Sequence, residues 1–114
     1  MKIENIVELT RRLENLVRIG TVVEVDTKQN PPVCRVQTGE ITTDWRPWVA
    51  QRAGSARKWW APTKDEQVIL VSPSGDLASA MVFCSLYSAQ NPPPDDHETR
   101  DRTIYPDGTV IEYD

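Results

Sequence analysis

The sequence predicts an all-β fold, in which a five-stranded antiparallel barrel of the OB type follows one amphipathic helix. Three observations support this prediction. Five short segments carry apolar residues at every second position, as strands with one buried face do. Turns that contain Gly or Pro separate these segments, and five coiled antiparallel strands close as an OB-fold. Long helices do not alternate with the strands, which excludes a parallel α/β sheet.

The composition is that of one globular domain. The 114 residues are 39% hydrophobic and 26% charged, and a chain of this length buries enough surface to fold without a disulfide or a metal. Cys34 and Cys84 lie far apart without a CxxC motif or a signal peptide, so we expect reduced thiols on half-buried strands of a cytosolic protein. No apolar run approaches the roughly 20 residues of a membrane span. The net charge of −4 argues against most nucleic-acid binders, which have a basic face.

Residues 1–16 are expected to form an N-terminal helix. From Ile3 to Leu16 the apolar side chains recur at the helical period and share one face, while Glu8 and Arg12 form a favourable i, i+4 pair. The apolar residues are Ile3, Ile6, Val7, Leu13 and Leu16. We expect this stripe to pack on the core of its own barrel. Packing on another subunit is the alternative, and the sequence does not separate the two.

Residues 17–87 are expected to form the barrel. The five predicted strands span residues 17–25, 33–38, 41–49, 66–71 and 77–87. Gly20 marks a place where the first strand bends between two faces, and Pro47 puts the third strand at a sheet edge or breaks it. The apolar run from Glu66 to Val71 predicts a strand buried on both sides, and Ser72 to Asp76 predicts a turn.

All four tryptophans lie between Ile41 and Leu70. They are Trp45, Trp48, Trp59 and Trp60. Each can bury about 150 to 250 Å², and its indole N–H usually needs a polar partner, so we expect the four to anchor a core or a partner interface. Between them, Gln51 to Arg57 is small and basic without an apolar period, which predicts a loop between two tryptophan-bearing strand ends.

The composition changes after the barrel. Residues 88–102 contain three consecutive prolines and a charged run, which predicts an extended linker. Residues 103–114 contain two strand arms about a Pro-Asp-Gly turn, and a lone hairpin is only marginally stable in water. We expect Ile104, Tyr105 and Val110 on these arms to pair with something outside the hairpin, as the start of a β-stem.

A series of ordered motifs resembles one known family. The motifs are Thr42–Trp48 (TTDWRPW), Arg52–Arg57 (RAGSAR), Trp59–Leu70 (WWAPTKDEQVIL), Ser72–Asp76 (SPSGD) and Ser85–Pro94 (SLYSAQNPPP). Together they look like the N-terminal domain of the phage baseplate assembly protein V family, the central spikes of contractile tails, and the equivalent domain of type VI secretion spikes is similar. The resemblance covers Leu16 to Asp114. This sequence has Asp65 where the family usually has Gly, and Cys84 where the family often has Gly.

The resemblance implies an OB-fold followed by a trimeric β-helical needle. Such a homotrimer caps the tail tube, contacts the tail hub and other baseplate proteins, and helps to pierce the bacterial outer membrane. It belongs to the virion baseplate and is assembled in the host cytoplasm, and no nucleic acid is expected as a partner. The metal-binding apex histidines of the family's needle have no counterpart in this sequence. The residues expected to serve structure or interfaces are Trp45, Trp48, Trp59, Trp60, Pro62, Glu66, Tyr87, Ile104, Tyr105 and Val110.

We expect no enzyme activity, cofactor or metal. His97 is the only histidine and lies in the linker, whereas a hydrolytic triad or a zinc site needs partners. The acidic residues around it lack the spacing of a calcium loop and are interpreted as solvated, with weak cation binding as the alternative. These residues are Asp95, Asp96, Glu98 and Asp101. The sequence contains no Gly-rich phosphate loop and no GxSxG or HExxH motif.

A nucleic-acid-binding OB module is the alternative function. Basic residues are interleaved with the four tryptophans, and no acidic residue lies between Trp45 and Lys64, which is typical of proteins that bind single strands. The basic residues are Arg46, Arg52, Arg57, Lys58 and Lys64. The acidic remainder of the chain favours the structural spike instead. Three of the tryptophans adjoin a proline or another tryptophan, as residues at packed corners do, and this also favours the structural spike.

Overall fold

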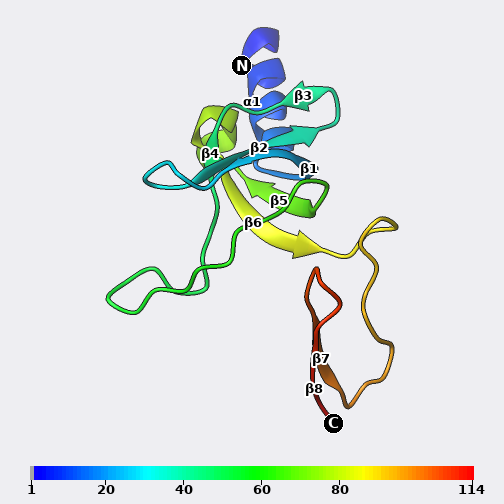
Figure 1. Ribbon diagram of the computed structural model, residues 1–114. Coiled ribbons are helices and arrows are strands. Elements are labelled where there is room, and N and C mark those ends of the chain that lie inside the picture. Colours follow the sequence, from blue (N-terminus) through cyan, green and yellow to red (C-terminus); the bar gives the residue numbers. More distant parts are fainter. Residues whose placement is uncertain (1) are drawn as a thin grey trace.

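The computed structural model describes residues 2–114 and shows a mostly β protein with one N-terminal helix (Figure 1). The helix is α1 (Ile3–Asn15). The main sheet contains β1 (Val17–Asp26), β2 (Val33–Thr38), β3 (Ile41–Thr42), β4 (Arg46–Pro47), β5 (Gln67–Val71) and β6 (Met81–Leu86). Two short 3₁₀ helices, η1 (Pro73–Gly75) and η2 (Leu77–Ser79), precede β6. A separate hairpin contains β7 (Asp101–Ile104) and β8 (Val110–Tyr113).

The main sheet is organised about β1, which pairs with two different strands. The strand order is β3-β2-β1-β5-β6, and β4 also pairs with β2. The first half of β1 pairs with β5 and the second half with β2, and the change of partner occurs at Thr21. A Cβ on the preceding Gly20 would lie 2.5 Å from Val36 Cγ1 and 2.7 Å from the Gln37 carbonyl oxygen. Only glycine permits this close approach where β1 changes partner, whereas the irregularity in the β1–β2 ladder lies further along, between Val22 and Glu24.

The two edges of the sheet meet at Trp48. This residue forms an isolated parallel bridge with Val82 of β6, and the next amide, Val49 N, donates to the Val82 carbonyl at 2.8 Å. Nearby, Arg46 Nε donates to the Ala80 carbonyl at 2.9 Å. Within residues 2–114 no continuous ladder joins β4 to β6, so the sheet is curled with its edges in contact at one seam. We call this curled, incompletely closed sheet the barrel.

The core lies inside the curled sheet and consists of small and medium aliphatic side chains. Its fully buried members are Val22, Cys34, Val36, Val68, Leu70, Ala80 and Val82. Among the tryptophans, Trp48 packs against this cluster. At the rim, buried Thr38 Oγ1 donates to the Ile19 carbonyl at 3.0 Å and accepts from Arg18 Nε at 3.0 Å. These polar groups at the rim are thus satisfied, as burial requires.

Three of the strand predictions are wrong in detail. The predicted strand 41–49 is broken into β3 and β4, and both pieces pair with β2. The break lies at residues 43–45 rather than at Pro47, because side chains there bond to the backbone: Thr43 Oγ1 accepts from Val36 N at 3.1 Å and Asp44 Oδ1 accepts from Trp45 N at 2.8 Å. Residues 77–79 are helical because the Asp76 carboxylate accepts from Ala78 N at 3.0 Å, which caps η2. β5 is fully buried on one face only, since Val68 and Leu70 point inward while Gln67, Ile69 and Val71 are partly exposed.

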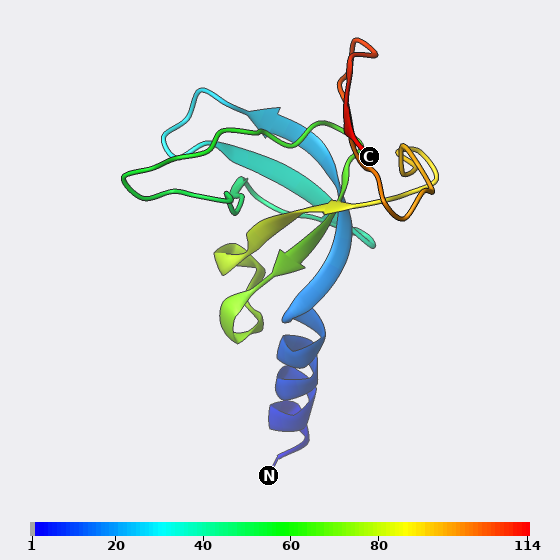
Figure 2. The same cartoon turned by 90° about the horizontal axis from the view of Figure 1, so that it is seen from below.

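The apolar stripe of α1 does not pack on the core of its own barrel, so that expectation is wrong. Ile3, Val7 and Leu13 are 79%, 63% and 59% exposed. The helix meets the barrel only at its C-terminal end and through its polar side, where buried Asn15 Oδ1 accepts from Arg18 Nη1 at 3.1 Å. Beyond that point α1 extends away from the sheet (Figure 2). None of the helices in residues 2–114 is long and apolar enough to cross a membrane.

The C-terminal hairpin forms a separate arm beside the barrel. Its turn is closed where Tyr105 N donates to the Thr109 carbonyl at 2.8 Å, and Gly108 has a positive φ of 87°. Every residue of β8 is exposed. The hairpin lies beyond the end of β6, and the molecule measures 58 × 33 × 25 Å (Figure 1). The predicted arms about the Pro-Asp-Gly turn are confirmed as strands, and β7 begins two residues earlier than predicted.

Candidate interaction surface

Half of the predicted interface residues line one groove between the barrel and the hairpin. They are Trp60, Pro62, Glu66, Tyr87 and Ile104, and the groove has a volume of about 470 Å³. Trp60 stacks on Tyr105 of the hairpin, with ring centroids 6.1 Å apart and planes inclined by 5°. Trp60 is nevertheless 66% exposed, whereas the nearby Pro62 is buried. The groove is therefore an open aromatic surface that joins the hairpin to the barrel.

The thiols near this groove are protonated at neutral pH. Burial, with a smaller effect of the Glu66 carboxylate, raises the pKa of Cys84 to about 12 and that of Cys34 to about 11. Both cysteines are free, but Cys34 is fully buried whereas Cys84 is exposed at the residue level, so the expectation of two half-buried side chains is wrong. A nucleophilic cysteine requires a lowered pKa, so neither side chain is prepared for covalent chemistry.

The other tryptophans have aromatic or cationic partners outside the hairpin. Trp48 and Trp59 form a tilted pair with centroids 5.9 Å apart, and Trp59 is 62% exposed. The Arg35 guanidinium lies 5.9 Å from the ring centroid of Trp45, within the range of a cation–π contact. Only Trp48 thus serves the core of the chain, and Trp45, Trp59 and Trp60 are surface residues.

A basic loop connects the two tryptophan-bearing segments, as predicted. We define the basic loop as residues 50–60, and every residue from Gln51 to Trp60 is exposed. Two backbone hydrogen bonds hold its shape, from Lys58 N to the Arg52 carbonyl at 2.9 Å and from Gly54 N to the Ala56 carbonyl at 3.1 Å. The loop reaches sideways from the barrel, away from the hairpin, in both views (Figures 1 and 2).

Further apolar side chains are exposed that the sequence reasoning did not single out. On the hairpin, Ile111 and Tyr113 are exposed beside the predicted Ile104 and Val110. On the outer face of the main sheet, Ile19, Ile69 and Phe83 form one cross-strand row. The period-two pattern contains the signal for this row, because these residues occupy the alternate positions to the buried Val68 and Val82.

The acidic linker is held by arginines and shows no metal cluster among the described residues. Asp95 forms ion pairs with Arg100 at 3.4 Å and with Arg102 at 3.7 Å, and the backbone N–H of Asp96 lowers the pKa of the Asp95 carboxyl. His97 Nδ1 lies 3.0 Å from Thr99 Oγ1. In the part of the chain that the structure describes, no three His, Cys, Asp or Glu side chains group as metal ligands would.

Two comparisons show which known proteins this chain is similar to. A family model described as "Type VI secretion system/phage-baseplate injector OB domain" matches residues 18–87. The "Spike protein" of Escherichia phage P2 is 46% identical over 110 residues, which make up 96% of this chain and 51% of that protein. The chain therefore spans about half the length of this curated relative. The matched region of the family model contains nearly all of β1, the whole of β2 to β6 and the basic loop.

Proposed function

Since the chain belongs to the type VI secretion system/phage-baseplate injector OB-domain family, we propose that it is a structural, non-catalytic part of the central spike in a contractile tail baseplate. The observation that carries this proposal is the 46% identity to a phage spike protein over 110 residues. An alignment of that length necessarily extends beyond residues 18–87 into the helix and hairpin segments. The relationship thus includes the appended elements as well as the OB-type barrel.

The spike is proposed to be a homotrimer that caps the tail tube. A needle coaxial with a tube needs a rotational axis, and heterologous contacts that repeat until they meet produce a closed ring. The outer edges of β7 and β8, which are unpaired within residues 2–114, support this arrangement, because exposed strand edges seek a partner. In the trimer, three hairpins would begin the needle that contributes to piercing the bacterial outer membrane.

The barrel and helix are proposed to serve the opposite end of the spike. The seam between Trp48 and Val82 would complete a closed five-stranded barrel in the assembled particle. The exposed stripe of α1 would face the tail hub and other baseplate proteins, since isolated helices of this length are marginal in water and require a partner. Assembly would occur in the cytoplasm of the host bacterium, and the finished protein would reside in the virion baseplate.

Localisation in assembled particles tests this function directly. We expect gold-labelled antibodies against the chain to mark the distal end of contractile tails in electron micrographs. Particles assembled without the protein should lack complete baseplates, and addition of the purified chain to extracts of such a mutant should restore them. Labelling along the whole tail, at the head, or of no particle at all would contradict a role in the spike.

A further inference from the structure

We propose that the basic loop of one copy docks on the acidic stem of a second copy. We define the acidic stem as residues 95–114, which comprise the end of the linker and the β7–β8 hairpin. The inference rests on the proposed function only in expecting that copies form a ring. It identifies which surfaces of the chain meet in that ring and by what chemistry.

The two segments carry opposite charges. Between Trp45 and Lys64 there are five basic residues and no acidic residue. The acidic stem contains seven acidic residues and two arginines. Such a separation of charge within one chain brings unlike charges together when one copy contacts the next, and it disfavours contacts between like segments.

The charges inside the acidic stem are only partly paired. Arg100 pairs with Asp95 and Asp114, and Arg102 pairs with Asp95 and Glu112, the latter at 2.7 Å. Both arginines are therefore occupied. Within residues 2–114, the acidic residues of the stem without an ion pair are Asp96, Glu98, Asp101 and Asp107.

The basic side chains of the loop have no acidic partner in the described part of their own chain. Arg52, Arg57 and Lys58 form no ion pair within residues 2–114, and all three are exposed. Exposed single ion pairs contribute little, but several pairs that share one docked surface act together. The loop and the stem thus offer matching sets of unused charges.

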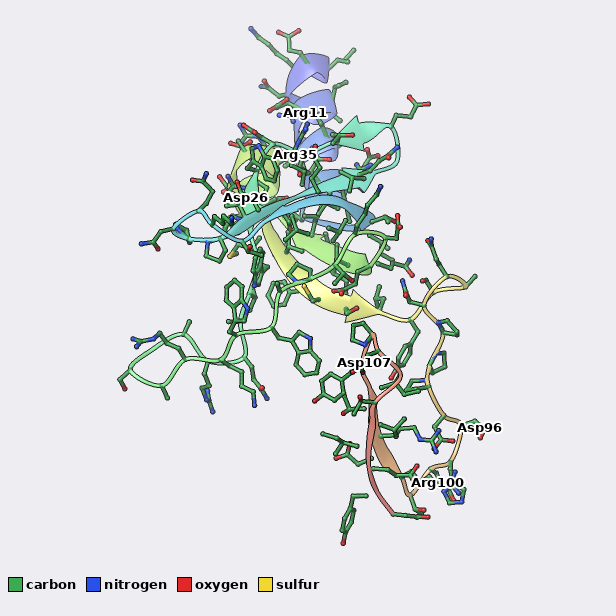
Figure 3. The ribbon with its side chains drawn as sticks, viewed as in Figure 1. Arg11, Asp26, Arg35, Asp96, Arg100 and Asp107 are labelled. Carbon is green, nitrogen blue, oxygen red and sulfur yellow. The ribbon has the colours of Figure 1, made fainter. Side chains whose placement is uncertain are left out.

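Geometry keeps the basic side chains of the loop away from the stem of its own copy. Trp60, the last residue of the loop, stacks on Tyr105 near the tip of the hairpin, so the loop touches its own stem only at this end. The loop then points away from the hairpin in both cartoon views (Figures 1 and 2). Asp96 projects from the stem on the side that faces away from the loop (Figure 3). A neighbour related by rotation can bridge this separation, because each copy then gives a loop and receives one.

Exposed apolar side chains accompany the charges on both surfaces. Trp59 adjoins Lys58 on the loop, and Ile111 and Tyr113, the latter 78% exposed, lie on the stem. Stable protein interfaces combine an apolar or aromatic centre with a polar rim. The contact is therefore expected to combine burial of the aromatic rings with the charge pairs around them.

Charge reversal and charge exchange test this contact. The first variant carries R52E, R57E and K58E, the second carries D96K, E98K and D101K, and the third carries all six substitutions. We expect each single-sided variant to associate about tenfold more weakly or worse, measured by light scattering and sedimentation, since like charges then face each other. The six-substitution variant should recover association. Raising the salt from about 0.1 M to about 1 M should weaken the wild-type association and the rescued one alike.

A matched control and a folding measurement keep the result interpretable. K28E reverses an exposed charge in the β1–β2 turn and should leave association unchanged. The substituted side chains lie outside the core cluster, so thermal midpoints should remain close to that of the wild type. An oligomer that tolerates both single-sided variants, or a wild-type chain that stays monomeric at high concentration, would overturn the proposed contact.

The remaining outcomes separate this contact from nucleic-acid binding and from the spike function. If the charge exchange fails to rescue and the loop instead binds a labelled single-stranded oligonucleotide with steep salt dependence, the loop serves nucleic acid and the proposal is wrong. A charge-dependent oligomer that antibodies do not place in the tail would support the contact and refute the spike function. If the antibodies place the chain in the tail but its oligomer does not depend on these charges, the spike function is supported and the proposed contact is refuted.

Discussion

At the scale of single residues, the backbone at position 65 explains a departure from the family pattern. Asp65 has a φ of 74°, in the left-handed region that glycine adopts without a steric penalty. Its amide donates to the Val22 carbonyl at 2.8 Å, so the turn that precedes β5 is tied to β1. The family resemblance places Gly here, and the structure gives the physical reason for that preference.

We predict that D65G raises the free energy of unfolding by up to about 1 kcal/mol. Glycine removes the strain of the left-handed backbone in the folded state, but it also increases the conformational entropy of the unfolded chain. The first effect is only slightly larger than the second, since Asp tolerates this conformation better than most residues. D65A should lower the free energy by about 1 kcal/mol, because alanine lacks that tolerance. Urea unfolding of the three proteins measures both values. A stabilised D65A, or a strongly destabilised D65G, would show that the Asp65 side chain itself matters.

A second prediction concerns Trp60. Replacement of a fully buried tryptophan by alanine lowers stability by about 3 to 5 kcal/mol, but Trp60 is mostly exposed and its principal partner is Tyr105. We expect W60A to lower the free energy of unfolding by only about 1 kcal/mol, the usual contribution of an aromatic pair. L70A, which empties a fully buried site, should lower it by about 2 to 5 kcal/mol. Equal losses in the two variants would place Trp60 within the cooperative core.

At the scale of elements, the attachment of α1 depends on Gly75 of η1. Gly75 has a φ of 71°, and a Cβ at this position would collide with the backbone of Arg12. We predict that G75A detaches the C-terminal end of the helix from the barrel. Because a free helix of 13 residues is marginal in water, helical circular dichroism should fall. Trypsin should then cleave faster after Arg11 and Arg12.

The control for this prediction is G54A. Gly54 has open space around its Cα and lies in the basic loop, so alanine should leave both the helical signal and the cleavage rate unchanged. A G75A variant that keeps wild-type protection at Arg11 would show that η1 shifts to accommodate the methyl group. The exposed apolar stripe would then be unaffected by the contact at its end.

Elements could be predicted from the sequence where the cause is local. The 3.6-residue period and the Glu8–Arg12 pair located α1, and Glu8 accepts from Arg12 at 3.0 Å as expected. The strand bounds near 33–38 follow from a short hairpin strand between turns, and those near 66–71 follow from a compact apolar run. The packing partner of the apolar stripe on α1 could not be predicted, because an apolar helix face does not specify which surface covers it. The helical turn at 77–79 depends on a single capping side chain, Asp76, inside an otherwise strand-like segment.

The candidate site was only partly visible in the sequence for a similar reason. The bulk of the side chain marked Trp60, and the motifs that resemble the spike family contain Pro62 and Tyr87; the structure brings these three into one groove with Glu66 and Ile104. The stacking of Trp60 on Tyr105 joins residues that are far apart in the sequence, and no local pattern encodes such a contact. The sequence also did not show which tryptophans belong to the core. We expected the four to anchor a core or a partner interface, but only Trp48 packs against the small interior of the curled sheet.

At the scale of the whole molecule, the chain divides into a barrel with its own core and three exposed appendages. The fully buried core residues all lie on or beside β1, β2, β5 and β6. The basic loop, the apolar stripe of α1 and the β7–β8 hairpin are largely exposed. Stability is therefore expected to reside in the barrel, whereas assembly is expected to depend on the appendages.

This division predicts that removal of Thr103 to Asp114 abolishes assembly but lowers the stability of the barrel only slightly. The hairpin contacts the barrel through the Trp60–Tyr105 stack and the groove around it, so its loss should lower the thermal midpoint by less than about 5 °C. Association should be lost, because the deletion removes the unpaired strand edges and part of the acidic stem. Calorimetry and light scattering on the same samples measure the two effects.

Two outcomes would contradict this division of roles. A large fall in the thermal midpoint would mean that the hairpin completes the fold of the barrel. An unchanged oligomer would locate the assembling element elsewhere. The exposed stripe of α1 and the row formed by Ile19, Ile69 and Phe83 are then the surfaces to mutate, since both present apolar side chains to water and such faces mark interaction sites.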